Sequence, residues 1–402
     1  MSLNDTPQSE RIHIGFFGRT NAGKSSLVNK ITNQDLAIVS DTKGTTTDPV
    51  YKAMEILPLG PVVIIDTPGF DDDGILGEKR ISRTKLMLNK TDVAVLVVDL
   101  VEGMASTDEQ LIKLFEEKGI PYIIAFNKAD LKETVSAGKA NEIYVSSVTG
   151  KNIDELKEMI AKAGLQKPAA TPLISDLIKP GDTVVLVIPI DGSAPKGRII
   201  LPQQQVLREV LDTNAIAYIA QDTDLPRLLE NLKTPPALVV TDSQAFGKVS
   251  KMVPKNIKLT SFSILLARHK GFLESAVKGV WAIETLEDGD TVLISEGCTH
   301  HRQCEDIGTY KIPKWLREYT GKDINIETTS GLTFAEDLTK YKMIIHCGAC
   351  MLNDREMIYR TKCANDCGIP MTNYGTAIAY MHGILWRSLE VFPDMLKESD
   401  NK

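Results

Sequence analysis

The sequence lacks long apolar runs, an excess of basic residues and, over most of its length, cysteine. No stretch approaches the ~18 consecutive apolar residues that a membrane-spanning helix needs. Residues 1–11 are polar and lack the apolar core of a signal peptide. We therefore expect a cytoplasmic protein with no membrane contact. The formal net charge of −7 provides no basic surface for general nucleic-acid binding, so we also expect no nucleic-acid partner.

Cysteine is confined to the C-terminal part of the chain. All six cysteines lie at position 298 or beyond. In a reducing compartment, clustered thiols are more often metal ligands than disulfide partners. The clustering therefore predicts a metal-binding region near the C-terminus.

The rest of the composition is that of a folded protein with several domains. The chain has 402 residues, 43% hydrophobic and 25% charged, which is longer than one core usually spans. Residues 11–167 alternate short β-branched runs with amphipathic stretches, a pattern typical of a mostly parallel, doubly wound sheet. In this part we expect strands at 12–17, 62–65, 93–98, 122–126 and 143–145, and helices at 24–31 and 106–118.

Two further alternating blocks follow a linker at 168–172, which is rich in proline and alanine. In these blocks we expect strands at 183–190, 215–219, 237–241, 291–295 and 342–346, and helices at 204–212, 226–231, 315–319 and 377–389. We place the domains at 1–168, 173–262 and 263–402. The strand near 184–190 is a candidate to extend a sheet across a two-fold axis.

Residues 18–25, with the sequence GRTNAGKS, match the phosphate-loop pattern G-x-x-x-x-G-K-S/T. They lie between an expected strand and an expected helix, which is the context that this motif requires. Backbone N–H groups of such a loop converge on the β-phosphate, aided by the positive end of the following helix. Lys24 is expected to reach the β- and γ-phosphate oxygens, and Ser25 to bind Mg²⁺.

Three further motifs follow in the order expected of a guanine-nucleotide site. In Asp66-Thr-Pro-Gly69, the aspartate would act on Mg²⁺ through water and the Gly69 N–H would contact the γ-phosphate. In Asn127-Lys-Ala-Asp130, the final carboxylate can accept hydrogen bonds from the N1–H and amino groups of guanine, which adenine cannot supply. Ser146 and Ser147 follow the next strand and would close over the base. Together the four motifs predict GTP binding.

The set resembles the GTPase domains of the tRNA-modification and Era-like branch. Phe70 stands where Ras-like proteins carry the glutamine that orients water. Asn21 and the segment 44–46 resemble a potassium-dependent subset, which implies K⁺-stimulated hydrolysis with Thr45 in the K⁺ loop and Thr46 as a Mg²⁺ ligand. The expected catalytic residues are Asn21, Lys24, Thr46 and Gly69. The expected nucleotide contacts are Gly18, Asn21, Ala22, Gly23, Lys24, Ser25, Ser26, Asp66, Asn127, Lys128, Asp130, Ser146 and Ser147.

Two groups of cysteine and histidine follow expected strands in the last block. Cys298-Thr-His300 follows the strand at 291–295, and His346-Cys347-Gly-Ala-Cys350 follows the strand at 342–345. Because α/β sheets bind ligands outside the carboxyl ends of their strands, these groups are expected to converge. Thiolates select zinc or an iron–sulfur cluster, and the spacing alone leaves both open. Cysteines not expected to be primary ligands are Cys304, Cys363 and Cys367.

A GTPase domain followed by C-x-H and then H-C-x-x-C resembles the [FeFe]-hydrogenase maturation GTPases, the HydF family. The resemblance covers all three blocks. It implies a [4Fe-4S] cluster on Cys298, Cys347 and Cys350, a middle dimerisation domain, and a scaffold that delivers the two-iron subcluster precursor to apo-[FeFe]-hydrogenase. The implied partners are that hydrogenase, two radical-SAM maturases and further copies of the chain, as a homodimer or higher.

The fourth iron of such a cluster would be open or weakly held. Residues close enough in sequence to fill it are His300, His346, Glu296 and Glu305, and the sequence does not rank them. The alternative function is that of a GTPase with a structural zinc domain in ribosome or RNA assembly, which the negative net charge disfavours. The predicted fold class is α/β, with an N-terminal P-loop GTPase doubly wound sheet, a small α/β dimerisation domain and a C-terminal α/β iron–sulfur cluster domain.

Overall fold

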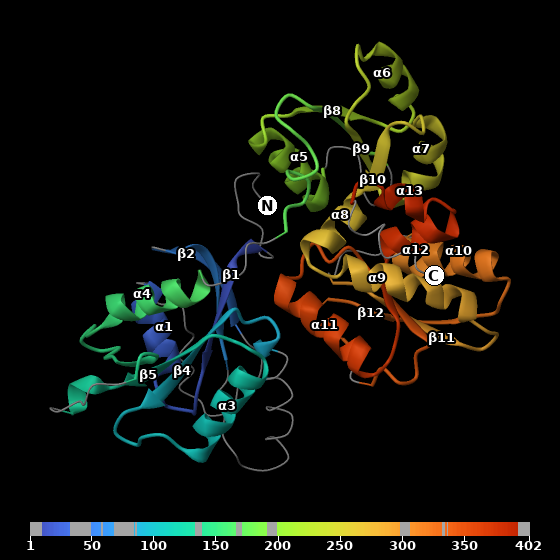
Figure 1. Ribbon diagram of the computed structural model, residues 1–402. Coiled ribbons are helices and arrows are strands. Elements are labelled where there is room, and N and C mark those ends of the chain that lie inside the picture. Colours follow the sequence, from blue (N-terminus) through green and yellow to red (C-terminus); the bar gives the residue numbers. More distant parts are fainter. Residues whose placement is uncertain are drawn as a thin grey trace. The chain divides into compact units, whose positions relative to one another are not determined.

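The computed structural model describes residues 10–32, 50–57, 59–67, 84, 87–132, 139–165, 171–190, 199–297, 306–331, 334–335 and 337–392. The chain divides into two compact units, Met1–Ala169 and Ala170–Lys402 (Figure 1). None of the described helices is long and apolar enough to span a membrane.

The first unit contains a six-stranded sheet with the order β2-β3-β1-β4-β5-β6. Neighbouring strands are parallel except for β2 and β3, which are antiparallel. The strands are β1 (Ile12–Phe17), β2 (Val50–Ile56), β3 (Gly60–Asp66), β4 (Val93–Asp99), β5 (Tyr122–Asn127) and β6 (Glu142–Tyr144). Every residue of β4 is buried, as expected for an inner strand of a sheet that is covered on both faces.

Helices cover both faces of this sheet. Figure 1 shows α1 (Lys24–Thr32) and α4 (Ile153–Gly164) on one face and α3 (Ser106–Glu117) on the other, and the short helix η2 (Ala129–Leu131) follows β5. Val95 of β4 packs into the core formed with α1 and α4, whereas its neighbour Leu96 packs into the core formed with α3. Because successive side chains of a strand point to opposite faces, one apolar run contributes to both cores.

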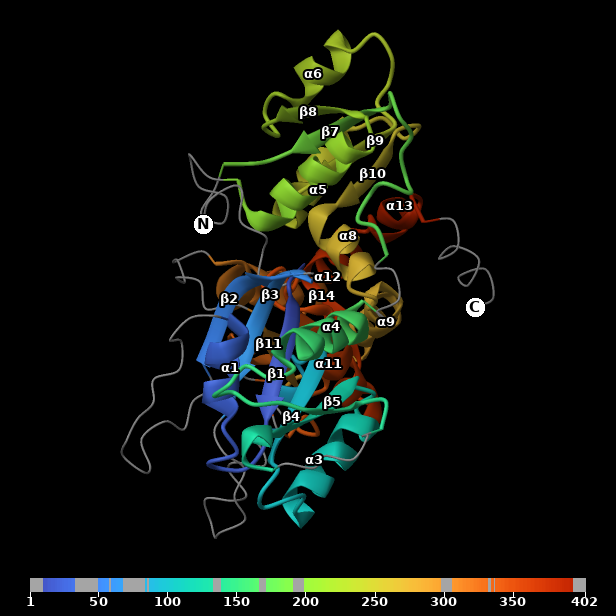
Figure 2. The ribbon, with the colours of Figure 1, turned by 90° about the vertical axis from the view of Figure 1, so that its left-hand side faces the viewer.

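The second unit contains two four-stranded parallel sheets, ordered β10-β9-β7-β8 and β12-β11-β13-β14. Figure 2 shows the strands of the first sheet side by side. The strands are β7 (Thr183–Val187), β8 (Ile216–Ala220), β9 (Leu238–Thr241), β10 (Lys258–Ser261), β11 (Thr291–Ser295), β12 (Asn325–Thr329), β13 (Met343–His346) and β14 (Met371–Asn373). The strand order reverses between β7 and β9 and between β11 and β13. Such reversal points form crevices in which α/β proteins bind ligands.

The two sheets of the second unit share one apolar core. A single cluster of buried residues extends from Leu173 to Phe392 and includes strands of both sheets. Arg387 also joins the two halves, because it donates hydrogen bonds to the carbonyl oxygens of Ser250 at 2.6 Å and Val253 at 2.7 Å. The helices are α5 (Leu201–Asp212), α6 (Leu225–Asn231), η3 (Ser243–Ala245), α7 (Phe246–Met252), α8 (Phe262–His269), α9 (Leu273–Gly279), η4 (Val280–Thr285), η5 (Ile307–Lys311), α10 (Ile312–Thr320), α11 (Asp354–Asp366), α12 (Tyr374–Met381) and α13 (Leu385–Leu389).

The predicted α/β class is confirmed, and each expected strand overlaps a strand of the structure. The prediction of one helix at 377–389 is wrong, because the chain forms two helices there. Gly383 lies between them with φ of +68°, a left-handed conformation that ends helices. The strand near 184–190 cannot extend the sheet as suggested, because β7 already pairs with β8 on one side and β9 on the other.

Candidate functional site

The phosphate loop between β1 and α1 depends on two glycines. Gly18 has φ of +138° and Gly23 has φ of +87°. A Cβ atom on Gly18 would lie 2.2 Å from the carbonyl oxygen of Val97, and one on Gly23 would lie 2.3 Å from Asn127 Nδ2. Both the conformations and these close approaches exclude larger residues. The loop therefore fits tightly against β4 and β5.

Lys24, Ser25 and Asp66 meet at the start of α1. Lys24 is buried, and its Nζ donates a hydrogen bond to the carbonyl oxygen of Gly18 at 2.9 Å. Ser25 Oγ donates to Asp66 Oδ2 at 2.9 Å, while Asp66 Oδ1 is buried without a hydrogen-bond partner among the described residues. Burial raises the pKa of Asp66, against the Ser25 hydrogen bond and the Lys24 charge. A hydroxyl beside a carboxylate with an unsatisfied oxygen fits Mg²⁺, which prefers oxygen ligands.

Asn127 connects the phosphate loop to the loop after β6. Its side chain is fully buried, Nδ2 donates to the carbonyl oxygen of Ala22 at 3.1 Å, and Oδ1 accepts from the Ser147 N–H at 3.1 Å. Asp130 is exposed, and its Oδ1 accepts a hydrogen bond from Ser146 Oγ at 2.5 Å. The structure thus brings together the residues predicted to bind the guanine base.

The other predicted nucleotide residues have different placements. Lys128 has φ of +66°, and its Nζ donates to Asp99 Oδ2 at 2.5 Å. Asn21, with φ of +65°, and Ser26 are exposed. Residues that lie outside the described ranges are Gly44, Thr45, Thr46, Gly69 and Phe70. The K⁺ loop, the second Mg²⁺ ligand and the γ-phosphate contact therefore stay predictions.

Arg19 is a phosphate-loop residue that the sequence does not single out. Its Nε lies 3.2 Å from Asp108 Oδ2, and its Nη2 donates to the carbonyl oxygen of Gly103 at 2.6 Å. Asp108 is fully buried in the first turn of α3, and burial raises its pKa against the Ala105 N–H and the Arg19 charge. This ion pair ties the phosphate loop to α3. The sequence signal for it is a single arginine at the second position of the loop.

The cysteine loop follows β13, at the reversal point between β11 and β13. The Cys347 N–H donates to the carbonyl oxygen of Ser295 at 2.9 Å. The N–H groups of Gly297 and Ala349 point at Cys347 Sγ, at 3.1 Å and 3.4 Å. Burial raises the pKa of the Cys347 thiol, and these two N–H groups oppose that rise. N–H groups directed at a sulfur stabilise the thiolate, which is the form that binds metals.

His346, the last residue of β13, has both ring nitrogens engaged. Nδ1 lies 2.9 Å from the carbonyl oxygen of Cys347, and Nε2 lies 3.1 Å from Arg360 Nη1. Because a guanidinium can only donate, Nε2 is the acceptor and Nδ1–H donates to the carbonyl. Burial and the Arg360 charge lower the pKa of His346 to about 3, so the ring is neutral. Both nitrogens of His346, one of the four candidates for the fourth iron position, are thus occupied by hydrogen bonds.

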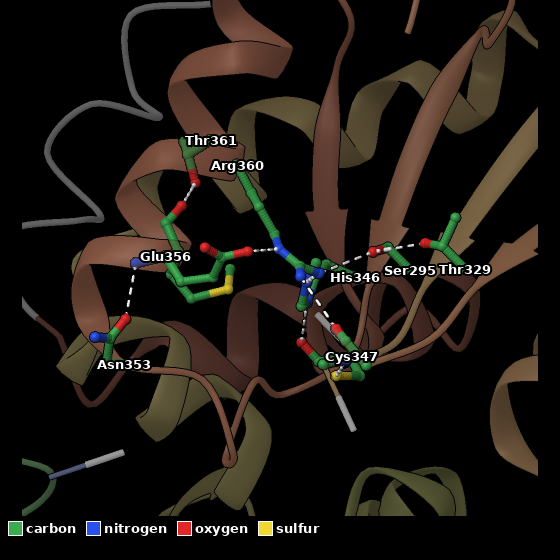
Figure 3. A network of polar contacts seen from close by, with 11 residues as sticks. Ser295, Thr329, His346, Cys347, Asn353, Glu356, Arg360 and Thr361 are labelled. Atoms are coloured by element: carbon green, nitrogen blue, oxygen red, sulfur yellow. Dashed lines mark hydrogen bonds and ion pairs between the residues drawn. The ribbon is translucent and has the colours of Figure 1, made fainter. Parts of the chain in front are cut away.

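Arg360 of α11 is the centre of a polar network beside the cysteine loop (Figure 3). Its Nε donates to Glu356 Oε1 at 2.9 Å, and Nη1 donates to Ser295 Oγ at 3.3 Å. Nη2 donates to the carbonyl oxygen of Gly331 at 3.2 Å, and Thr329 Oγ1 lies 3.1 Å from Ser295 Oγ. Arg360 and Glu356 are both buried. Sequence reasoning missed both residues.

The described part of the cysteine site fits a thiolate-bound metal centre without completing it. Cys347 and Cys350 lie on one loop, and thiolates supported by backbone N–H groups suit both zinc and iron–sulfur clusters. Glu296 is buried and accepts a hydrogen bond from the Tyr374 hydroxyl at 3.2 Å. Residues outside the described ranges are Cys298, His300, Cys304 and Glu305. Among the described residues, no three histidine, cysteine or acidic side chains form a metal site.

Three family models match the chain. Residues 13–128 match the model described as 50S ribosome-binding GTPase. Residues 173–271 match the hydrogen maturase F dimerization domain, and residues 274–391 match the hydrogen maturase F tetramerization domain. The last two models together cover more than half of the chain. The chain belongs to the hydrogen maturase F family.

Other GTPases resemble part of this hydrogen maturase F chain. The tRNA modification GTPase MnmE of Streptococcus pneumoniae is 36% identical over 172 residues, which are 41% of this chain and 37% of that protein. The GTPase Der of Kosmotoga olearia is 31% identical over 194 residues, 42% of this chain and 43% of that protein. The crystal structure of a probable GTP-binding protein, engB, is 25% identical with a TM-score of 0.32 and covers 39% of this chain and 100% of that one. The chain spans less than half of the length of either curated relative.

The matches confirm the predicted family and the predicted N-terminal GTPase domain. They also describe the C-terminal segment as a tetramerization domain, a role that the sequence reasoning did not assign. The cluster itself stays a prediction, since two of its three expected thiols are described and the third is not.

Proposed function

We propose that this chain is a GTP-hydrolysing carrier that binds a [4Fe-4S] cluster with an exchangeable iron position and delivers the two-iron subcluster precursor to apo-[FeFe]-hydrogenase. One observation carries the proposal. A chain of the hydrogen maturase F family places two cysteines, with N–H groups directed at one sulfur, at the strand-reversal point of its C-terminal sheet. Reversal points are where α/β sheets bind ligands.

The residues that would hold the cluster are Cys298, Cys347 and Cys350. A cubane held by three thiolates supplies one iron whose remaining position can exchange ligands. Gly297 adjoins Cys298 in the sequence and donates its N–H to Cys347 Sγ. This hydrogen bond supports the idea that the two cysteine segments face one centre. His300 stays a candidate for the fourth position, whereas both nitrogens of His346 are already engaged.

For GTP hydrolysis, each residue of the phosphate site has a role. Lys24 would exchange its bonds to the loop carbonyls for bonds to the β- and γ-phosphate oxygens. Ser25 and Thr46 would bind Mg²⁺, and Asp66 would hold the ion through water. The buried, unpartnered Asp66 Oδ1 supports this assignment, because it leaves a carboxylate oxygen for that water. Gly69 would contact the γ-phosphate, and Asp130 would select guanine.

Hydrolysis in this proposal is stimulated by K⁺. Asn21 is exposed on the phosphate loop, where its side-chain oxygen could join a K⁺ shell with the segment 44–46. The ion would supply the positive charge that an arginine finger supplies in other GTPases. Initial rates of GTP hydrolysis in potassium and in sodium salts test this role of Asn21.

The partners in this proposal are apo-[FeFe]-hydrogenase and two radical-SAM maturases. A homodimer or a higher oligomer is expected, and the matches to a dimerization and a tetramerization domain support it. The domains in this proposal are a GTPase domain at 1–168, a dimerisation domain at 173–262 and a cluster domain at 263–402.

Anaerobic purification tests the proposal. We expect brown protein that contains iron and acid-labile sulfide and that hydrolyses GTP. Colourless protein with zinc would instead favour the structural zinc domain of a GTPase that acts in ribosome or RNA assembly. The delivery step is tested by mixing the chain, loaded by its maturases, with apo-hydrogenase and measuring hydrogen production, with Cys347→Ala as the unloaded control.

A further inference from the structure

Arg360 is a buried cation that the proposed function does not yet use. Its side chain is fully buried, and burial of a charge is costly unless the charge is paired and hydrogen-bonded. Glu356, one helical turn earlier, provides the counter-charge at 2.9 Å. The Phe334 ring lies 5.1 Å from the guanidinium carbon and covers one of its faces. The ion pair and the ring contact together fix the position of the guanidinium.

The guanidinium links α11 to three segments at the edge of the C-terminal sheet. It donates to Ser295 at the end of β11, to His346 at the end of β13 and to the Gly331 carbonyl after β12, and it extends from α11. Ser295 is the register partner of both Thr329 and His346, so these contacts form one row at the carboxyl edge of the sheet. Figure 3 shows this row converging on the guanidinium.

This row ends at the cysteine loop. His346 Nδ1–H donates to the carbonyl oxygen of Cys347. The orientation of the ring therefore fixes the backbone of the first loop cysteine. Asn353, the N-cap of α11, accepts the Glu356 N–H at 3.0 Å just after the loop. The helix that carries Arg360 therefore begins directly after the loop and is capped there by Asn353.

We propose that Arg360 is a positioning residue of the cluster site: it holds His346 as a hydrogen-bond acceptor, away from iron, and anchors the Cys347 loop through that ring. With Glu356 it also sets the charge beside the cluster. This inference rests on the proposed function, since it needs a cluster to act on. It assigns His346 a supporting role and leaves the exchangeable iron without this imidazole.

Substitutions at His346 distinguish a hydrogen-bonding role of this side chain from direct binding to iron. Glutamine can accept the hydrogen bond from Arg360, whereas it does not replace an imidazole as an iron ligand. We expect His346→Gln to keep wild-type iron and sulfide per chain and an unchanged pulsed-EPR spectrum of the reduced cluster in protein labelled with ¹⁵N-histidine. We expect His346→Phe, which can neither accept nor donate, to lose about 10-fold or more in cluster affinity, the scale of lost supporting contacts at metal sites.

Substitutions at Arg360 and Glu356 test the charge. We expect Arg360→Met to lower the reduction potential of the cluster and Glu356→Gln to raise it, because the two remove charges of opposite sign. A loss of packing alone would move both variants in the same direction. Arg208→Met is the matched control, because Arg208 forms an (i,i+4) ion pair with Asp212 on the exposed face of α5. We expect this control to have the wild-type potential.

The outcomes separate this inference from the proposed function. Wild-type protein without iron would contradict the proposed function. Wild-type protein with a cluster whose ¹⁵N signal disappears in His346→Gln would make His346 a ligand and overturn the inference. Equal potentials in wild type, Arg360→Met and Glu356→Gln would remove the charge role of Arg360, and wild-type cluster affinity in His346→Phe would remove its positioning role.

Discussion

Asn127 Nδ2 donates a hydrogen bond to the carbonyl oxygen of Ala22 at 3.1 Å. Through this bond the end of β5 holds the phosphate loop, while the oxygen of the same amide accepts the Ser147 N–H. One buried side chain therefore fixes two of the loops that would surround the nucleotide.

Replacing Asn127 should affect the protein with and without nucleotide. Asn127→Ala leaves the Ala22 carbonyl and the Ser147 N–H without partners, which is expected to cost about 1–3 kcal/mol in the free energy of unfolding. Denaturant unfolding with and without GDP measures both effects. We expect lower stability without GDP and a smaller stabilisation by GDP than in wild type. Equal stabilisation by GDP would show that the amide contributes nothing to binding.

The ionised side chain of Asp66, which would hold Mg²⁺ through water, is expected to lower the free energy of unfolding. Burial raises its pKa in the folded state. As pH rises, Asp66 therefore loses its proton at a lower pH in the unfolded chain than in the folded protein. The free energy of unfolding falls between these two pKa values and stays lower at higher pH. We expect Asp66→Asn to be more stable than wild type at neutral pH and to hydrolyse GTP poorly. Melting curves across this pH range, without nucleotide, provide the measurement. A melting temperature of Asp66→Asn below that of wild type at neutral pH would contradict this sign.

The GTPase and the cluster are expected to respond separately to substitution. Lys24→Ala removes a phosphate contact in one compact unit and leaves the other unit untouched. We expect GTP turnover to fall roughly 100-fold or more, the scale of losing one charge-stabilising donor at a reacting centre. Iron per chain should match wild type. Loss of both properties would mean that the two units do not fold independently.

Potassium is expected to accelerate GTP hydrolysis beyond sodium at equal ionic strength. Asn21→Ala should remove this difference, while Asn214→Ala, at an exposed left-handed asparagine of the second unit, serves as the control. Initial rates of phosphate release in each salt provide the measurement. If wild type hydrolyses GTP equally fast in both salts, Asn21 is a turn residue and no K⁺ site exists.

Iron loading is expected to depend on three of the six cysteines. Cys298→Ala, Cys347→Ala and Cys350→Ala should each lose the cluster, because two thiolates rarely retain a cubane. Cys363→Ala, on α11, and Cys367→Ala, at the C-cap of that helix, should retain it and serve as controls. His300→Ala should keep the iron and change the spectrum of the reduced cluster. If all four site variants lose iron equally, His300 is a permanent ligand.

The nucleotide site was accessible to sequence reasoning because its parts are local. Each motif directly follows a strand, and parallel strands bring their carboxyl ends to one edge of a sheet. The apolar run at β4 also predicts an inner strand, since it has no polar face. Local motifs therefore predicted which residues converge. They did not predict the contact between Arg19 and Asp108, which are far apart in the sequence.

The polar network around Arg360 could not be read in the same way. Glu356 and Arg360 are four residues apart on a polar helix, a spacing that usually indicates a solvent-exposed ion pair. Their burial results from contacts of α11 with the ends of β11 and β13 and with Gly331 after β12, which no local pattern encodes. For the same reason, the position of His346 next to Cys347 suggested a ligand. The ring faces Arg360 because Nε2 accepts a hydrogen bond from it, and this contact comes from the fold and not from the local sequence.

The two sheets of the second unit share one apolar core, and this limits which parts of the chain can be exchanged during evolution. The two family models meet between residues 271 and 274, yet Asn373 Nδ2 donates to the Ser263 carbonyl at 3.1 Å across that division. A gene fragment that encoded only one of the two sheets would yield a polypeptide with half of a core and an exposed apolar face. We therefore expect the GTPase unit to be exchangeable as a module, and the two sheets with the cysteine loop to be inherited together.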